Sequence, residues 1–424
     1  MIRIVKSSEL KSKGVIRESV ENTSLRDTVG SIIKNVKNNG DEALKKYTKE
    51  FDGIEISDFE VSRASIDKAF KEVDAEFIKV LQKAAANIEE FHRNQINTGF
   101  DLVPKNGVIL GQKVTPIARV GCYIPGGSVP YISSVLMNCI PAKIAGVKEI
   151  IMVTPPCATS KGVDIRILAA AKIAGADRVF MVGGAQAVAA LAFGTQSIPR
   201  VDKITGPGNA YVTEAKRQVY GIVGIDMLAG PSDVLIIADK TTNPVYIAAD
   251  MLSQSEHDAD ASAVLVTDSM TLAKKVRAEI ETQLAQLPRK DIATDSINSK
   301  GLIIVSGTIN EAFDISNERA PEHLEIMLDE PFNYLNKVIN AGSIFLGKST
   351  PETFGDYIAG PNHTIPTNGT ARFSSPLSVD DFVKKSSYIY FSDEALNEKG
   401  PDAILFAKEE NLDAHAVAVE KRLK

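Results

Sequence analysis

Residues 149–194 read EIIMVTPPCATSKGVDIRILAAAKIAGADRVFMVGGAQAVAALAFG, a stretch that alternates short apolar runs with helical patterns. EIIMVTP and RVFMVGG have the length of strands, whereas DIRILAAAKIAG and AQAVAALAFG have apolar residues at helical spacing. Such alternation predicts βαβ units and a parallel sheet. Because the strand runs are continuously apolar, we expect both faces of this sheet to be buried.

The same alternation of short apolar runs and helical patterns extends in both directions along the chain. It begins near residue 115 and returns in a second set of runs after LAGPSD (228–233), which we interpret as the seam between two lobes. The residues before the first lobe are predicted to be helical, as are those at the C-terminus. The sequence therefore predicts an α/β protein with four parts: an N-terminal helical segment (1–105), a first lobe (106–228), a second lobe (229–375) and a C-terminal helical segment (376–424).

Composition excludes several classes of protein. The chain has 424 residues, 44% apolar and 24% charged, with a net charge of −6 and no Lys/Arg block, so we expect no nucleic-acid partner. No apolar run has the roughly 18–20 residues that a membrane span needs, and we expect no membrane contact. The N-terminus lacks the apolar core of a signal peptide, which favours a cytoplasmic protein. Three cysteines (Cys122, Cys139, Cys157) argue against a disulfide framework and a thiolate zinc finger.

Three glycine-rich turns follow strands and precede helices in the first lobe: IPGG (124–127), VGGAQ (182–186) and GPGN (206–209). Backbone N–H groups at such helix starts can receive phosphate. None of the turns is G-x-G-x-x-G, and Tyr211 occupies the place of the third glycine after GPGN. Spacing alone leaves both alternatives open, nucleotide binding and ordinary βα turns.

The stretch SQSEHDAD (253–260) ends an apolar helix. Gln254 and His257 are three residues apart and share one helical face, where an amide oxygen and a neutral imidazole can both ligate a metal. Glutamine is a weak ligand, so for this pair alone a solvated helix end is the better interpretation. His92, in the charged tail of an earlier helix, is predicted to be a surface histidine.

Other candidates lie further along the chain. Glu322 and His323 in APEHL stand between a helix and a strand, and we expect them at the carboxyl edge of the second sheet, where acid–base groups gather around ligands. A buried structural histidine is the alternative there. Asp356 lies in a long irregular stretch and is a candidate oxygen ligand. Glu410 and His415, taken alone, are an exposed face of a terminal helix.

Taken together, these stretches resemble the histidinol dehydrogenase family. The resemblance runs in the family's order through VGCYIPGG, VGGAQAVAALAFGT, VDKITGPGNAYVTEAKR, GIDMLAGPSDVLIIAD, DMLSQSEHD, ERAPEHLEI, GDYIAGPNHTIPT and ENLDAHAVAV, and it spans nearly the whole chain. It implies two incomplete Rossmann-like lobes of the aldehyde-dehydrogenase type with small terminal segments. It also implies a zinc-dependent homodimer that oxidises L-histidinol to L-histidine through L-histidinal, using two NAD⁺, in the last steps of histidine biosynthesis.

The resemblance also implies roles for individual residues. It places NAD in the first lobe and the metal and catalytic residues in the second. The matching zinc (Zn²⁺) ligands are Gln254, His257, Asp356 and His415. The catalytic pair is Glu322 and His323. Substrate contacts are Ser232, His323, Glu410 and the four metal ligands, with Glu410 and His415 completing a partner's site. The NAD-binding positions are Tyr123, Gln186 and Asn209.

The chemistry of these residues agrees with that activity. Nitrogen and oxygen donors without thiolate suit an open zinc site, although they do not exclude Mn²⁺ or Co²⁺. His323 is the natural base for the alcohol, since an unperturbed imidazole has a pKa of about 6.5, and Glu322 is placed to activate the water that hydrates the aldehyde. The family works without a covalent cysteine, so a thiohemiacetal route through Cys122 is not expected.

Two alternative functions are compatible with parts of the sequence. The first is oxidation of another small alcohol, such as a sulfonated diol, which relatives of the family carry out; the presence of both Glu410 and His415 favours histidinol. The second is a non-catalytic metal- or nucleotide-binding protein, and the acid–base pair in APEHL argues against it.

Overall fold

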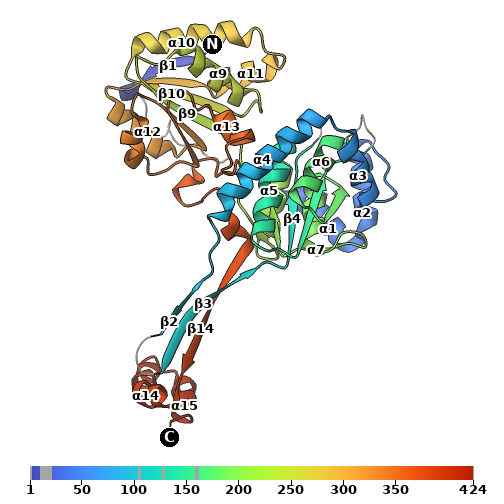
Figure 1. Ribbon diagram of the computed structural model, residues 1–424, viewed down its shortest axis with the longest axis vertical. Helices are drawn as coiled ribbons and strands as arrows, with labels where there is room; N and C mark the ends of the chain where they lie inside the picture. Colours follow the sequence, from blue (N-terminus) through green and yellow to red (C-terminus); the bar gives the residue numbers. More distant parts are fainter. Residues whose placement is uncertain (1, 10–21, 104–106, 127–128, 158–161, 424) are drawn as a thin grey trace.

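The computed structural model describes residues 2–9, 22–103, 107–126, 129–157 and 162–423. These residues form two α/β lobes and a long arm that leaves the lobes and carries the C-terminus at its tip (Figure 1). The predicted boundary between residues 105 and 106 lies outside the described residues, as does Gly127 of the IPGG turn.

The first lobe is built on a five-stranded parallel sheet with the strand order β6-β5-β4-β7-β8. Its strands are β4 (Arg119–Tyr123), β5 (Glu149–Thr154), β6 (Arg178–Met181), β7 (Lys203–Thr205) and β8 (Gly224–Ile225). Strands β5 and β6 are the two runs predicted within residues 149–194, and the short β8 was not predicted. Between them lie α5 (Ile132–Ile144), α6 (Ile165–Ala174), α7 (Gly184–Phe193) and α8 (Ala210–Val219). The parallel sheet predicted from residues 149–194 is therefore confirmed.

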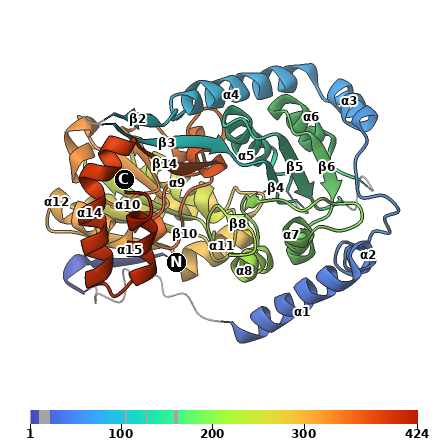
Figure 2. The same ribbon diagram turned by 90° about the horizontal axis from the view of Figure 1, so that it is seen from below.

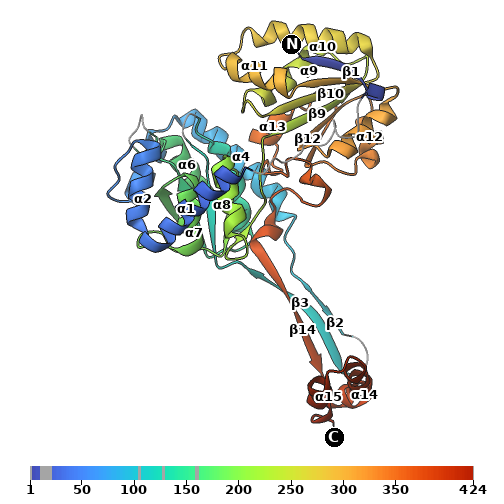
Figure 3. The same cartoon turned by 180° about the vertical axis from the view of Figure 1, so that it is seen from behind.

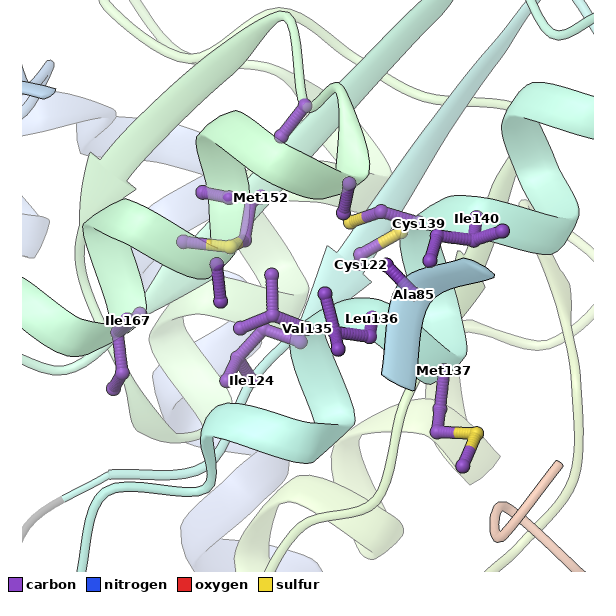
Figure 4. Close-up of a cluster of buried hydrophobic side chains, with 14 of the residues drawn as sticks. Ala85, Cys122, Ile124, Val135, Leu136, Met137, Cys139, Ile140, Met152 and Ile167 are labelled. Atoms are coloured by element: carbon purple, nitrogen blue, oxygen red, sulfur yellow. The ribbon is translucent and has the colours of Figure 1, made fainter. Parts of the chain in front are cut away.

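The N-terminal helices complete the two faces of this sheet. They are α1 (Thr23–Asn39), α2 (Asp41–Tyr47, continued by a π turn at Thr48–Asp52), α3 (Arg63–Glu72) and α4 (Ala75–Arg93). Apolar residues of α3 and α4 pack with α5 and α6 on one face, where Cys122 and Cys139 lie among buried aliphatic side chains (Figure 4). Helices α1 and α2 pack with α7 on the other face. Burial on both faces explains why the strand runs are continuously apolar.

The second lobe holds a six-stranded parallel sheet with the order β1-β11-β10-β9-β12-β13. Its strands are β1 (Arg3–Lys6), β9 (Asp233–Ala238), β10 (Ser262–Thr267), β11 (Leu302–Val305), β12 (His323–Met327) and β13 (Ser343–Leu346). Helices α9 (Pro244–Ser255), α10 (Met270–Leu284) and α11 (Lys290–Ser299) pack on one face, and α12 (Ile309–Arg319) packs on the other. Helix α13 (Glu352–Tyr357) follows β13, and short helical turns occupy Ser7–Glu9, Pro331–Lys337, Thr370–Arg372 and Val379–Phe382.

Strand β1 departs from the helical prediction for the N-terminal segment. It pairs in parallel with β11, with Arg3 opposite Leu302, and so forms an edge of the second sheet rather than part of the first lobe (Figure 3). Four residues are too few to carry a period that separates strand from helix in the sequence. Pairing with a distant strand therefore decides the conformation of this segment.

The arm is a three-stranded antiparallel sheet with the order β14-β3-β2, capped by two helices. Its elements are β2 (Phe100–Leu102), β3 (Val108–Pro116), β14 (Val383–Phe391), α14 (Asp393–Glu409) and α15 (Asp413–Glu420). Strand β14 pairs with all of β3, from Val383 opposite Pro116 to Phe391 opposite Val108. The C-terminal segment was predicted to be helical, and the structure corrects this for β14, whose exposed residues carry no burial pattern to read.

Helix α4 ends at the base of the arm, and here the structure contradicts the prediction for His92. This histidine is fully buried. Its Nδ1 lies 2.7 Å from Oε1 of Gln95, and that oxygen also accepts the N–H of Val379 at 3.1 Å. The charged residues around His92 in the sequence lie on other faces of the helix, so composition alone misplaced it. No helix of the described residues has the length and apolarity to cross a membrane.

Candidate active site

The Glu322–His323 pair lies at the amino edge of the second sheet, not at the carboxyl edge predicted from the sequence. His323 is the first residue of β12, and β9, which pairs with β12, begins at Asp233. Only three residues separate the end of α12 from β12, so the pair belongs to a short helix-to-strand turn, and such turns lie at the amino ends of parallel strands. Ser232 immediately precedes β9 and lies at the same edge.

Asp233 holds both residues of the pair. The backbone N–H of Glu322 donates to Oδ1 of Asp233 at 2.7 Å, and the backbone N–H of Asp233 donates to Oε2 of Glu322 at 2.8 Å. Nδ1 of His323 lies 3.1 Å from the Asp233 carbonyl oxygen. Because a carbonyl only accepts, Nδ1 carries the proton in this contact. The lone pair of the neutral ring is therefore on Nε2, as a base requires.

Burial shifts both side chains toward their neutral forms. It raises the pKa of Glu322 well above its usual range, and the nearby charge of Asp233 raises that pKa further. Burial lowers the pKa of His323, an effect that Asp356 partly opposes. The imidazole is thus neutral near physiological pH, whereas the carboxyl group becomes a strong base once it loses its proton.

The chain brings three of the four predicted metal ligands to this edge. Helix α9 runs back from the carboxyl end of β9, so its buried Gln254 and the following His257 return to the amino edge. Asp356 lies on α13. The charges of Asp356 and His257 both act on His323. Asp356 and His257 therefore lie within electrostatic range of His323, and Gln254 lies at the end of the helix that precedes His257.

His363 is a neighbour that the sequence did not single out as a site residue. Its Nδ1 lies 3.1 Å from the backbone oxygen of Asp356, and its Nε2 lies 3.3 Å from Oγ of Ser134 on α5. It therefore connects a predicted metal ligand of the second lobe to a helix of the first. The signal in the sequence was its place in the long irregular stretch GPNH, since loops of that length are often functional.

Glu410 and His415 lie elsewhere. They are exposed at the tip of the arm, where Glu410 caps α14 and His415 belongs to α15 (Figure 1). Within the described part of the chain, no group of three or more His, Cys, Asp or Glu side chains is arranged to hold a metal ion. Of the four predicted metal ligands, Gln254, His257 and Asp356 thus belong to the second lobe, whereas His415 lies at the tip of the arm.

The predicted cofactor residues lie at the carboxyl edge of the first sheet. Tyr123 ends β4, and its hydroxyl accepts the N–H of Gly184 at 3.0 Å; burial raises its pKa to about 12. Asn209 caps α8, its side chain accepting the N–H groups of Tyr211 and Val212. Gln186 is buried on α7, and its Oε1 has no hydrogen-bond partner. An orphaned acceptor at a strand end is what a ligand with N–H or O–H donors would satisfy.

The two edges approach each other between the lobes. Asn362 donates to the backbone oxygen of Met137 on α5 at 2.6 Å, beside the contact between His363 and Ser134. Asn87 of α4 donates to the backbone oxygen of Ile358 at 2.7 Å. The segment after α13 therefore packs against the first lobe, which brings the amino edge of one sheet toward the helices that follow β4 of the other.

Known sequences show which family this chain belongs to. A sequence model described as histidinol dehydrogenase matches residues 15–423. The chain belongs to the histidinol dehydrogenase family. It is 52% identical to a histidinol dehydrogenase of Listeria monocytogenes over 98% of this chain and 96% of the relative. It is 50% identical to one of Clostridium acetobutylicum over 100% of this chain and 99% of the relative.

Solved structures agree with the family and the fold. A crystal structure of histidinol dehydrogenase from Elizabethkingia anophelis matches with a TM-score of 0.94 and 40% identity, covering 99% of this chain and 98% of that one. An acetylating aldehyde dehydrogenase from Geobacillus thermoglucosidasius matches with a TM-score of 0.50 at 14% identity, covering 87% and 97%. At this low identity, the match to the aldehyde dehydrogenase is evidence for the fold alone. It confirms the prediction of two lobes of the aldehyde-dehydrogenase type.

The three cysteines lie in the other lobe from Glu322 and His323. All three belong to the first lobe, and Cys122 and Cys139 are fully buried. A hydrogen bond with Cys122, together with burial, raises the pKa of the Cys139 thiol well above its usual range. A buried thiol with a raised pKa is a poor nucleophile.

Proposed function

We propose that this protein oxidises L-histidinol to L-histidine, through L-histidinal, in two successive NAD-dependent steps that end histidine biosynthesis. The observation that carries the proposal is the catalytic pair itself. The Asp233 carbonyl accepts the Nδ1–H of His323 and leaves Nε2 as the base, beside the buried carboxyl group of Glu322 and within electrostatic range of Asp356 and His257. Membership of the histidinol dehydrogenase family supports histidinol as the alcohol.

In this proposal His323 and Glu322 divide the proton transfers. Nε2 of His323 takes the hydroxyl proton of the alcohol in each oxidation, and the Nδ1 contact with Asp233 keeps the ring in position. Glu322 accepts a proton from the water that adds to the aldehyde, because oxidation to an acid has to pass through the hydrate. Its raised pKa makes the carboxylate a stronger base for that step.

The donor set fits zinc. Gln254, His257 and Asp356 would hold it together with His415 of the partner subunit, which gives two imidazoles and two oxygens without thiolate. Such a metal would hold the imidazole and amino nitrogens of the substrate and so fix the reacting carbon near His323. Ser232, at the same edge, and Glu410 of the partner subunit would contact the substrate.

The carboxyl edge of the first sheet fits NAD. Tyr123, Gln186 and Asn209 would contact it, and the unpartnered Oε1 of Gln186 is an acceptor for its donor groups. When bound, NAD⁺ supplies the hydride acceptor for both oxidations. Packing of the segment after α13 on α4 and α5 would keep bulk water from this site and hold the two edges together.

A homodimer completes the site in this proposal. The tip of the arm carries His415 and Glu410 away from both lobes of its own chain (Figure 1), and the view from below in Figure 2 looks onto α14 and α15 at this tip. These two residues can therefore serve only a neighbouring copy. The arm also exposes large apolar side chains that a partner would cover: Phe100, Val103, Ile389, Tyr390, Leu405 and Phe406. A cytoplasmic location and the absence of nucleic-acid and membrane partners stay predictions from the sequence.

The alternative substrate is another small alcohol, such as a sulfonated diol. The test follows NADH absorbance with purified protein, NAD⁺ and either alcohol, with and without a chelator. We expect two NADH per L-histidinol, loss of turnover on chelation and recovery with Zn²⁺. Turnover of the diol without turnover of histidinol would move the assignment to the alternative, and one NADH per histidinol would mean that the reaction stops at the aldehyde.

A further inference from the structure

A buried ion pair lies directly behind the GPGN turn and has no part in the proposed chemistry. Lys216, on α8, and Asp226, directly after β8, form a salt bridge in which both side chains are almost fully excluded from solvent. Burying two charges costs desolvation that their attraction offsets only with additional hydrogen bonds. Such a pair is a weak source of stability, so its other contacts matter.

Those other contacts converge on Gly206. Nζ of Lys216 donates to the carbonyl oxygen of Gly206 at 2.9 Å, and the N–H of Gly206 donates to Oδ2 of Asp226 at 2.7 Å. Oδ1 of Asp226 also accepts the N–H of Met227 at 2.7 Å. The ion pair therefore holds the peptide groups on both sides of one glycine.

Gly206 needs such support. Its φ of +111° lies in the region that side chains rarely adopt, and a Cβ there would collide with the carbonyl oxygen of Tyr123. The backbone of the turn is thus pressed against one predicted NAD-binding residue. Three residues later Asn209, a second one, begins α8. The conformation of Gly206 sets how these two residues stand relative to each other.

We propose that Lys216 and Asp226 are positioning residues for the dinucleotide: the pair preorganises the GPGN turn, and through it Tyr123 and Asn209, before NAD binds. This inference rests on the NAD role proposed above for the turn. When a turn is already ordered in its binding conformation, less of the binding free energy is lost in ordering it. We therefore expect the ion pair to increase the affinity for the cofactor. The site of histidinol lies at the other lobe and does not depend on it.

The test uses the full-length protein with Lys216→Met and with the double substitution Lys216→Met/Asp226→Asn. The double variant removes both charges, so it leaves no unpaired buried charge to unfold the lobe. We expect NADH, followed by its fluorescence, to bind about tenfold more weakly to both variants, the order expected for one lost charged hydrogen bond. The KM for NAD⁺ should rise with it, while the KM for L-histidinol stays within about twofold.

Arg119→Met is the matched control. Arg119 pairs with Glu149 at the opposite, amino edge of the same sheet, so its loss should leave both KM values unchanged. If the ion pair only stabilised the fold, variants that fold would bind NADH as tightly as the parent protein, and that result would overturn the inference. So would loss of folding in both variants, since it would make the pair a requirement of the whole lobe. Failure of the parent protein to bind NADH would remove the cofactor role of the turn and the inference with it.

Discussion

At the scale of single residues, the proposed catalytic pair is a neutral histidine and a buried carboxyl group held by the same aspartate. The backbone N–H and carbonyl of Asp233 contact the side chains of Glu322 and His323, and its carboxylate accepts the backbone N–H of Glu322, so an amide of the same shape can keep these contacts. This allows each proton transfer to be tested by a substitution of the same shape.

Glu322→Gln tests the division of labour. The amide oxygen can still accept the N–H of Asp233, so we expect the protein to fold normally. Oxidation of histidinol to histidinal should proceed at a rate within a few-fold of the parent, whereas oxidation of added histidinal should fall by roughly 100-fold or more, the usual contribution of a general base. Single-turnover measurement of NADH from each substrate separates the steps. Equal slowing of both would refute the assignment of Glu322 to the water.

The sequence could name most of these residues but not their surroundings. Gln254 and His257 were visible as a pair on one helical face, and APEHL as an acid beside a base. The prediction that the Glu322–His323 pair lies at the carboxyl edge was wrong. It followed the rule for nucleotide-binding lobes, whose sites lie at carboxyl edges, whereas this pair lies at the start of its strand. His363 was overlooked because its contacts, with Asp356 and Ser134, join parts of the chain that only the fold brings together.

At the scale of elements, three of them meet through buried carboxyl groups under the site: α9 with Asp250, β12 with Glu325 and α13 with Glu352. The N–H of Glu352 donates to Oε1 of Glu325 at 2.8 Å, and Ser253 Oγ donates to Oε1 of Glu352 at 2.5 Å. Burial raises the pKa of all three groups, that of Asp250 to about 6. These elements carry Gln254, His323 and Asp356, so the cluster connects the parts that hold the site.

This cluster predicts a pH-dependent stability. The unfolded chain releases the Asp250 proton near pH 4, whereas the folded chain keeps it up to about pH 6. Over that interval the unfolded state binds fewer protons, so the free energy of unfolding falls as pH rises. Asp250→Asn should remove this part of the decline, on the order of 2 kcal/mol. Urea unfolding of both metal-free proteins from pH 4 to 8 measures it, and parallel curves would contradict it.

Elements were predictable where burial leaves a pattern. Strands of both parallel sheets read as continuous apolar runs because helices cover both faces. Strand β14 carries no such pattern, because its residues are exposed. This strand lies outside the packed cores, where local preference gives the weakest guidance.

At the scale of the whole molecule, the arm decides what one chain can do. It places His415 and Glu410 on exposed helices beyond a long antiparallel sheet, and the lobes retain only part of the predicted ligand set. Nothing in composition or periodicity distinguishes these two residues from an ordinary terminal helix. Only the family resemblance assigned them to a partner's site. The arm is consistent with this assignment, because it carries both residues away from the lobes of their own chain.

The most direct test of this account mixes two inactive variants, His323→Asn and His415→Asn, by co-expression in one cell. In a heterodimer, one site combines both defects and the other combines an intact lobe with an intact arm tip. Random pairing should therefore restore about a quarter of the parent activity, followed as NADH formed from L-histidinol and NAD⁺, while each variant alone stays inactive. If every site were built within one chain, each chain would keep its own defect and the mixture would stay inactive, which would contradict the account.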